Sequence, residues 1–546
     1  MLNRNGNGHA ILNGNGHAIL RVQGLQADYQ QNGRYAEVLG PLSFELGKGE
    51  IVSLLGESGS GKSTLAKALT GLLPPSARIA GGTMTIASGS PVDLTGKQVP
   101  WQQIRGRQIA MLYQDAQQAL NPMLTIKQHF RESLRFHRLA SAEEVEDISL
   151  KLLGALNFPD PNSVWGRYPF QLSGGMCQRI CLALALCLKP AVLIADEPTS
   201  ALDTVSQKEV LDLLLRVREQ FGLTVLLITH DIAVANAVSD RVMVLNRGAI
   251  EEEGSTRAVL RKPKAAYTRE LLASRVSKAG SSEEVERLRL HEPLMEVVQL
   301  KKTFNRSKHV LQGVSLTLHR KEILGILGQS GCGKSTLAGC MAGLDSPSGG
   351  SILFRGTDIG RLRGKARRDM CRRIQLVFQN ARASLHPGRT AIQIVQEPLR
   401  YLRIGSKRER KRLAVHYLNE VGIVGDMLTR RPPQLSTGQC QRIAIARALV
   451  LQPDVLICDE AVSALDMSVQ AQILDLLKRL HRQHGIAMVM ISHDIRVLRS
   501  FCHNIAVMNN GSFCEVRQAS ALLQESDQPY TQLLLKCAGD MEVGLG

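Results

Sequence analysis

The stretch that decides the fold is IVSLLGESGSGKST at Ile51–Thr64, and ILGILGQSGCGKST at Ile323–Thr336 repeats it. In both, a run of five mainly apolar residues precedes the pattern GxxxxGKST. The apolar run predicts a buried strand. The glycine-rich pattern predicts a loop that opens a helix and binds phosphate through its backbone N–H groups. One such pattern alone is a weak signal, but two copies in the same strand–loop–helix context are specific.

A longer set of motifs follows each loop in the same order. LSGGM stands at Leu172–Met176 and LSTGQ at Leu435–Gln439; after each come an apolar strand ending in Asp-Glu and then an isolated His-Asp. From the signature serine to the histidine, each residue of the second set lies 263 positions after its counterpart. So long a period predicts two complete domains and not a solenoid.

Short β-rich runs alternate with helical segments in both halves, which predicts an α/β fold with two tandem domains, each a mainly parallel sheet covered by helices. The octapeptide NGNGHAIL occurs twice near the N-terminus, and its Gly and Asn content favours disorder. We therefore expect a disordered tail at 1–18, a first domain at 19–273, a polar linker at 274–293, a second domain at 294–538 and a C-terminal tail at 539–546.

The net charge of +18 is concentrated in the second half of the chain. Residues 1–280 hold 30 basic and 25 acidic side chains, against 37 and 24 in residues 281–546. The basic runs Arg361–Arg373 and Lys407–Arg412 carry no interleaved aromatics, so we favour a solvated face near lipid headgroups and expect no nucleic acid partner. No apolar stretch reaches the roughly 18 residues of a membrane helix, and we expect a cytosolic chain without a signal peptide.

The phosphate loops predict the first part of the chemistry. Lys62 and Lys334 would neutralise the β- and γ-phosphates, and the hydroxyls of Ser63 and Ser335 would bind Mg²⁺. Two further groups follow apolar strands whose carboxyl ends meet at the same edge of a sheet. There the aspartates Asp196 and Asp459 are candidate Mg²⁺ ligands, Glu197 and Glu460 would orient or polarise the attacking water, and His230 and His493 would contact the γ-phosphate.

The signatures, each followed closely by Gln-Arg, resemble those of ATP-binding-cassette (ABC) ATPases, and the chain looks like two such cassettes fused head to tail. The resemblance covers nearly everything from Ile19 to Cys537. It implies an α-helical signature subdomain in each domain, and two ATPs, each held between the phosphate loop of one cassette and the signature of the other. Lys62 would then work opposite Ser436 and Gly438, and Lys334 opposite Ser173 and Gly175.

The resemblance also implies roles for individual residues. Gln114 and Gln379 match the glutamine loop, which touches Mg²⁺ and the membrane partner, and Tyr29 and Phe304 match the aromatic that stacks on adenine. Mg²⁺ would be held by Ser63, Gln114 and Asp196 in one site and by Ser335, Gln379 and Asp459 in the other. The implied ATP contacts from the two loops are Gly56, Glu57, Ser58, Gly59, Ser60, Gly61, Lys62, Ser63 and Thr64, and Gly328, Gln329, Ser330, Gly331, Cys332, Gly333, Lys334, Ser335 and Thr336.

Both signatures depart from the family's LSGGQ, since Met176 replaces the glutamine in one and Thr437 replaces a glycine in the other. The serine and the second glycine are kept in both, as are both glutamates and both histidines. We therefore expect two hydrolytic sites that use ATP and Mg²⁺, with rates that need not be equal.

Within the family, the glutamine loops YQDAQQALNP and FQNARASLHP and the tails AAYTRELLAS and QPYTQLLLK are similar to the two ATPases of peptide and nickel importers. This implies a peripheral subunit on the cytoplasmic face of the bacterial inner membrane, which energises import of peptides, nickel or a metal-chelating small molecule. Its partners would be two transmembrane permease subunits and an extracytoplasmic substrate-binding protein. The alternatives are a soluble tandem ATPase acting on ribosomes or DNA, and a chain in which ATP binding is only a structural switch.

Overall fold

The computed structural model describes residues 18–31, 33–96, 98–139, 141–200, 202–273, 292–304, 308–463, 465–522 and 526–542. The predicted N-terminal tail (apart from Ala18), most of the predicted linker and the last four residues lie outside this described part. The chain divides into two compact units, the first from residues 1–199 and 209–269 and the second from residues 200–208 and 270–544.

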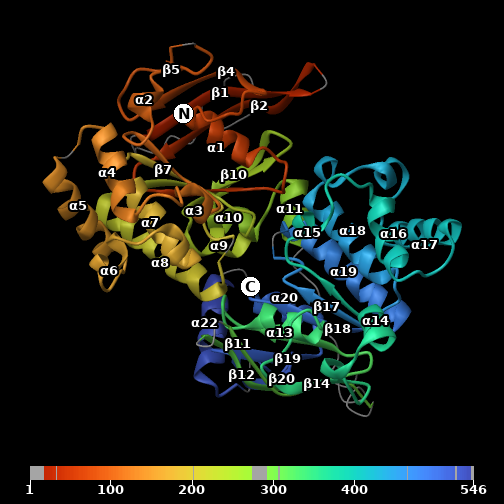
Figure 1. The fold of residues 1–546 in the computed structure, drawn as a ribbon. Helices are drawn as coiled ribbons and strands as arrows, with labels where there is room; N and C mark the ends of the chain where they lie inside the picture. The colour runs from red at the N-terminus through yellow and green to blue at the C-terminus, as the bar shows by residue number, and fades with distance from the viewer. Residues whose placement is uncertain are drawn as a thin grey trace. The chain divides into compact units, whose positions relative to one another are not determined.

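The elements of the first half of the chain are shown in Figure 1. Its strands are β1 (Ala18–Gln31), β2 (Arg34–Gly47), β3 (Ile51–Leu55), β4 (Ala77–Ile86), β5 (Val92–Asp93), β6 (Ile109–Leu112), β7 (Val192–Asp196), β8 (Thr224–Ile228), β9 (Arg241–Asn246) and β10 (Ala249–Ser255). Its helices are α1 (Lys62–Thr70), α2 (Trp101–Ile104), α3 (Ala116–Ala119), α4 (Ile126–Phe136), α5 (Ala142–Ala155), α6 (Pro161–Trp165), η1 (Pro169–Gln171), α7 (Gly174–Leu186), α8 (Thr204–Phe221), α9 (Ile232–Val238), α10 (Thr256–Arg261) and α11 (Ala266–Ala273).

The second half repeats this order. Its strands are β11 (Pro293–Phe304), β12 (Lys308–His319), β13 (Ile323–Leu327), β14 (Gly349–Phe354), β15 (Thr357–Asp358), β16 (Ile374–Val377), β17 (Val455–Asp459), β18 (Ala487–Ser492), β19 (Asn504–Asn509) and β20 (Ser512–Gln518). Its helices are α13 (Lys334–Met341), η2 (Ile359–Arg361), α14 (Gly364–Arg373), α15 (Ala381–Ser384), α16 (Ala391–Tyr401), α17 (Lys407–Glu420), η3 (Gly425–Thr429), η4 (Pro432–Gln434), α18 (Thr437–Leu449), α19 (Met467–His484), α20 (Ile495–Phe501) and α22 (Pro529–Glu542).

Each unit is built on a six-stranded sheet, with the order β10-β9-β3-β8-β7-β6 in the first and β16-β17-β18-β13-β19-β20 in the second. All neighbours are parallel except β9–β10 and β19–β20. The predicted α/β fold class with mainly parallel sheets is therefore confirmed. Each unit also has a four-stranded antiparallel sheet, β2-β1-β4-β5 or β12-β11-β14-β15, which sequence reasoning did not predict.

The central strands are mainly apolar because both faces of the sheet are covered. In β17, Val455 and Ile457 pack into one core of the second unit, while Leu456 and Cys458 pack into the core on the opposite face. The strands β3, β7 and β8 are completely buried in the first unit. This rigid layer fixes the ends of β3, β7 and β8, from which the functional side chains project.

A helical group packs at the β6 edge of the first sheet and at the β16 edge of the second, through α7 and α18 respectively. Figure 1 shows α4, α5, α6 and α7 together, and α15, α16, α17 and α18 together. These groups are the α-helical subdomains that the resemblance implies.

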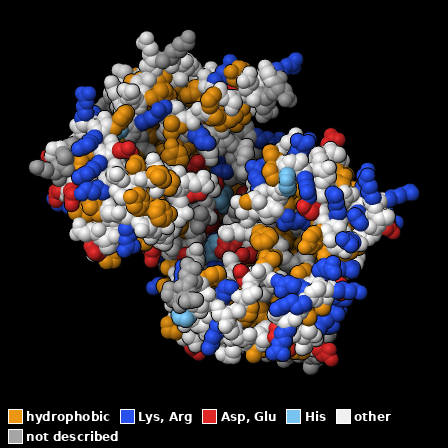
Figure 2. All heavy atoms as spheres, in the orientation of Figure 1, with side chains coloured by type: hydrophobic (Ala, Val, Ile, Leu, Met, Phe, Trp, Pro, Cys, Tyr) orange, Lys and Arg blue, Asp and Glu red, His pale blue; other side chains and the backbone are white. Residues whose placement is uncertain are grey.

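The two predicted basic runs lie on the second unit, over η2 and α14 and at the start of α17, and most of their Lys and Arg side chains are exposed. Figure 2 shows Lys and Arg side chains gathered around these helices. Within the described residues, no helix combines the length and the apolar character needed to cross a membrane.

Candidate nucleotide sites

The first candidate site forms where β3, β8 and β7 end side by side. The loop from Gly56 to Gly61 follows β3 directly and leads into α1. Asp196 is the last residue of β7, and His230 stands two residues after β8. Since neighbouring parallel strands end at the same edge, three segments far apart in the sequence meet at one place.

The loop needs glycine at its first and last positions. A Cβ on Gly56 would lie 2.3 Å from the carbonyl oxygen of Leu245, and one on Gly328 would lie 2.4 Å from that of Met508. Gly61 and Gly333 hold φ angles of 107° and 110°, a region that L side chains rarely adopt. This backbone brings the loop close to the sheet and turns it into the helix N-terminus, which favours anions.

The lysine of each loop is folded back onto the loop itself. Lys62 Nζ donates to the carbonyl oxygens of Gly56 at 2.7 Å and Glu57 at 2.8 Å. Its counterpart Lys334 donates to Gly328 at 2.8 Å and Gln329 at 2.7 Å. Both side chains are buried, at 6% and 4% exposed. A phosphate in the loop would offer each ammonium group a stronger, charged acceptor than these carbonyls.

A serine and an aspartate face one another beside the lysine. Ser63 Oγ donates to Asp196 Oδ1 at 3.2 Å, and Ser335 Oγ donates to Asp459 Oδ1 at the same distance. Hydroxyl and carboxylate oxygens are the ligands that Mg²⁺ prefers, and Mg²⁺ usually shares them with substrate phosphates. The described residues contain no group of three His, Cys, Asp or Glu side chains arranged to hold a metal by themselves. The serine hydroxyl and the aspartate carboxylate of each site are ligands that fit Mg²⁺.

The glutamate after each aspartate is held by two partners. Glu197 accepts from Gln114 Nε2 at 2.9 Å through one oxygen and lies 3.1 Å from His230 Nδ1 through the other. Its φ is 47°, as is that of Glu460, and such left-handed non-glycine residues cluster at functional sites. The backbone N–H of Glu197 donates to the carbonyl of Ile228 and fixes this conformation.

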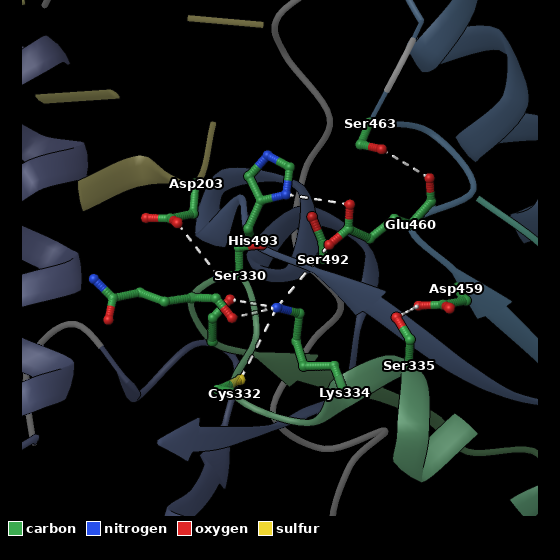
Figure 3. Close-up of polar contacts among 12 residues, drawn as sticks. Asp203, Ser330, Cys332, Lys334, Ser335, Asp459, Glu460, Ser463, Ser492 and His493 are labelled. Atoms are coloured by element: carbon green, nitrogen blue, oxygen red, sulfur yellow. Dashed lines mark hydrogen bonds and ion pairs between the residues drawn. The ribbon is translucent and has the colours of Figure 1, made fainter. Parts of the chain in front are cut away.

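The second site repeats this arrangement with small differences (Figure 3). Glu460 accepts from Gln379 Nε2 at 2.8 Å and lies 3.6 Å from His493 Nδ1, a looser pair than in the first site. Lys334 Nζ lies 4.0 Å from a carboxylate oxygen of Glu460 and 4.0 Å from Cys332 Sγ. The two sites therefore contain the same groups, but the histidine lies closer to the glutamate in the first site than in the second.

The pKa values separate the two carboxylates of each site. Burial raises the pKa of Asp196 above its usual value, and the hydrogen bond from Ser63 only partly offsets this. Burial also acts on Glu197, but the hydrogen bond and charge of His230 outweigh it and lower the pKa of that glutamate. Burial lowers the pKa of His230, whereas the hydrogen bond and charge of Glu197 raise it, with a net increase. Glu197 is thus held ionised, as an acceptor for a proton must be.

The signature serines lie at the N-termini of long helices. Ser173 caps α7 by accepting from Met176 N, and Ser436 caps α18 by accepting from Gln439 N. Gln439 returns a bond to the Ser436 N–H, which completes a capping box. Met176 has no side-chain oxygen, so α7 lacks this second bond. The departure of the first signature from LSGGQ therefore removes the second bond of the capping box but leaves the Ser173 cap in place.

The structure brings together Lys62, Ser63, Gln114, Asp196, Glu197 and His230, and likewise their counterparts in the second unit. In the described part of the chain, the signature serines Ser173 and Ser436 instead cap α7 and α18. Phe304 is 40% exposed at the end of β11, with Lys302 Nζ 4.9 Å from its ring centre. Its role and that of Tyr29 remain predictions.

Sequence reasoning missed one pair of contacts with the loops. Tyr267 Oη accepts from the N–H of Glu57, and Tyr530 Oη accepts from the N–H of Gln329, both at 3.1 Å. Both tyrosines stand in the tail segments AAYTRELLAS and QPYTQLLLK, whose similarity to each other was the only available signal.

These geometries define the class of protein: each unit carries a glycine-rich loop that opens a helix, an acid at a strand end and a glutamate directly after it, as a phosphate-loop ATPase does. The profile of the ABC transporter family matches residues 39–200 and 311–463. A protein called "Glutathione import ATP-binding protein GsiA" from Pectobacterium atrosepticum is 35% identical over 551 residues, which is 94% of this chain and 88% of that protein. The protein of that name from Escherichia coli K12 is 35% identical over 555 residues, with the same coverage.

Among solved structures, an ATP-binding cassette in a dimeric post-hydrolysis state with ADP and Pi is similar at 31% identity, with a TM-score of 0.39 and coverage of 41% of this chain and 98% of that one. Another, cbiO1 from Clostridium perfringens, part of the ABC transporter complex cbiONQ, has 29% identity, a TM-score of 0.40, and coverage of 43% and 92%. The chain belongs to the ABC transporter family, with two ATP-binding cassettes in one polypeptide, and it is an ATPase. The family profile and the two GsiA relatives confirm the predicted resemblance.

Proposed function

We propose that this chain is the energy-coupling subunit of a bacterial ABC importer for a peptide-like or metal-chelating small molecule. The observation that carries the proposal is the 35% identity, over 94% of the chain, to double-cassette proteins named for glutathione import. The presence of the same polar groups around both phosphate loops supports hydrolysis at two sites. Glutathione, a tripeptide, is therefore the first cargo to test.

In the proposed cycle, each lysine releases its loop carbonyls and binds the β- and γ-phosphates of ATP. The ionised Glu197 accepts a proton from the attacking water, and its two partners, Gln114 and His230, hold its carboxylate in place. Ser63 and Asp196 would hold Mg²⁺, which supplies charge neutralisation on the phosphates. Lys334, Ser335, Gln379, Asp459, Glu460 and His493 would do the same in the second site.

We further propose that each ATP is completed by the signature of the other cassette. Ser173 and Ser436 stand at exposed helix N-termini, where a γ-phosphate would be favoured by the helix field. ATP would then draw the cassettes together and hydrolysis would release them. Two cassettes in one chain fix the ratio of the halves and raise their effective concentration.

The partners that follow from this proposal are two transmembrane permease subunits and an extracytoplasmic binding protein. The chain would sit at the cytoplasmic face of the inner membrane through those permeases. No observation favours the alternative of an ATPase acting on ribosomes or DNA.

The test is uptake in proteoliposomes that contain this chain, the permeases encoded beside it and their binding protein. We expect ATP-dependent accumulation of labelled glutathione, a dipeptide or nickel, and loss of uptake with Glu197→Gln/Glu460→Gln. A chain that binds no permease, and whose ATPase is instead stimulated by ribosomes or DNA, would overturn the proposal.

A further inference from the structure

The tail of each cassette reaches back to the phosphate loop of the same cassette. In the first unit, α11 places Tyr267 Oη 3.1 Å from the backbone nitrogen of Glu57. In the second, α22 places Tyr530 Oη 3.1 Å from the backbone nitrogen of Gln329. Glu57 and Gln329 are both the second residue of their loops. The two halves therefore form the same bond although their sequences differ.

A second contact fixes where each tail begins. Glu252 on β10 accepts from the backbone N–H groups of Lys264 at 2.9 Å and Ala265 at 3.1 Å. In the second unit, Glu515 on β20 accepts from Ser526 Oγ, just before α22. Glu252 and Glu515 occupy equivalent positions, 263 residues apart. The tyrosine thus approaches the loop from a segment that is anchored to the sheet.

The bond to Tyr267 and the bonds from Lys62 hold different backbone atoms at the start of the loop. The carbonyls of Gly56 and Glu57 are occupied by Lys62 Nζ, whereas the N–H of Glu57 is occupied by Tyr267. When the ammonium group turns to a phosphate, it gives up those carbonyls. The tyrosine bond uses a different atom of the loop from the lysine bonds, so it remains when the ammonium group turns, and the phosphate would then bind the N–H groups that follow Glu57 in the loop.

From these contacts we infer that Tyr267 and Tyr530 are positioning residues, each of which holds its own phosphate loop in the conformation that receives ATP. The inference rests on the phosphate-binding role proposed for the loops. Burial raises the pKa of Tyr530 to about 12, so its hydroxyl stays protonated at neutral pH. A loop that is ordered before ATP binds loses less conformational entropy on binding, so we expect the two tyrosines to strengthen ATP binding.

The first test is hydrogen exchange of the full nucleotide-free chain, with Tyr267→Phe and Tyr530→Phe. Each change removes one hydroxyl and leaves the ring. We expect faster exchange of the Glu57 amide in the first variant and of the Gln329 amide in the second, with the other loop unaffected. Tyr401→Phe is the matched control, because Tyr401 is 82% exposed.

Two outcomes of this exchange experiment would overturn the inference. One is unchanged exchange at both loop amides. The other is faster exchange along the whole of α11 or α22 together with the loop, because the tail's packing and not the hydroxyl would then be responsible.

The second test separates binding from chemistry. Losing one hydrogen bond predicts a rise of about 2- to 12-fold in KM and Kd for ATP, with kcat nearly unchanged. A general loss of structure would lower kcat and the melting temperature instead, and that result would contradict a positioning role. Lys62→Ala and Lys334→Ala distinguish the two proposals. If the lysine variants weaken ATP binding and the phenylalanine variants do not, only the positioning role of the tyrosines is wrong. If the lysine variants leave ATP binding unchanged, the proposed phosphate site is wrong.

Discussion

Replacing Lys62 and Lys334 by alanine should weaken ATP binding strongly at both sites. Each ammonium group is buried and donates two short hydrogen bonds, so it is already fixed within the loop. A hydrogen bond to a charged phosphate contributes about 1.5–3 kcal/mol, which corresponds to an increase of about 10- to 150-fold in Kd. Isothermal titration of the full chain with ATP measures this for each variant.

The control for this experiment is Lys48→Ala, which removes one exposed positive charge from the first unit. We expect its Kd to match the wild type. The single lysine variants should each lose one class of site and leave the other. Equal affinity of the wild type and the double lysine variant would show that ATP does not bind at the two loops.

Three further predictions concern the first site. Ser63→Ala should raise the Mg²⁺ concentration that gives half-maximal ATPase activity, since it removes a hydroxyl beside Asp196; an unchanged requirement would place the metal elsewhere. The pKa of His230 is raised, so its pairing with Glu197 stabilises the fold below about pH 6.5, and this stabilisation is lost as the pH rises through the pKa of His230 in the folded protein. At acid pH the pairing ends when Glu197 is protonated, and the lowered pKa of Glu197 moves this limit to lower pH. The difference in melting temperature between the wild type and Glu197→Gln should therefore decrease as the pH is raised from about 6 to about 9. A difference that stays constant over this range would contradict the pairing. Gly61→Ala should destabilise the first unit by about 1–3 kcal/mol in chemical denaturation, because its Cβ would meet Leu39 at 2.6 Å and its φ is 107°; wild-type stability would contradict this.

The sequence was sufficient for the parts of the site that depend on short-range pattern. A run of five mainly apolar residues before GxxxxGK[ST] predicts strand, loop and helix, and the structure has the strand at Ile51–Leu55 and the helix from Lys62 onwards. The strands ending in Asp196 and Asp459 follow the same rule. Because parallel strands end at one edge, the meeting of loop, acid and histidine could also be predicted.

Other features depend on contacts between distant residues and left no local pattern. The antiparallel sheet pairs Leu20 with Ile86 and shifts register within β1, which alternation along one strand does not reveal. The bond from Glu57 to Tyr267 spans 210 residues. The distances from His230 and His493 to their glutamates differ, 3.1 Å against 3.6 Å, although the local sequences ITHD and ISHD are nearly the same.

In the proposed cycle, the two strand-end glutamates Glu197 and Glu460 carry ATP hydrolysis. The most direct measurement is the steady-state ATP turnover of the full chain with Glu197→Gln/Glu460→Gln, at saturating ATP and Mg²⁺. The loss of a proton acceptor predicts a fall of about 10²- to 10⁴-fold in kcat with ATP binding retained. Turnover equal to the wild type, in a variant that is folded and binds ATP, would contradict the claim.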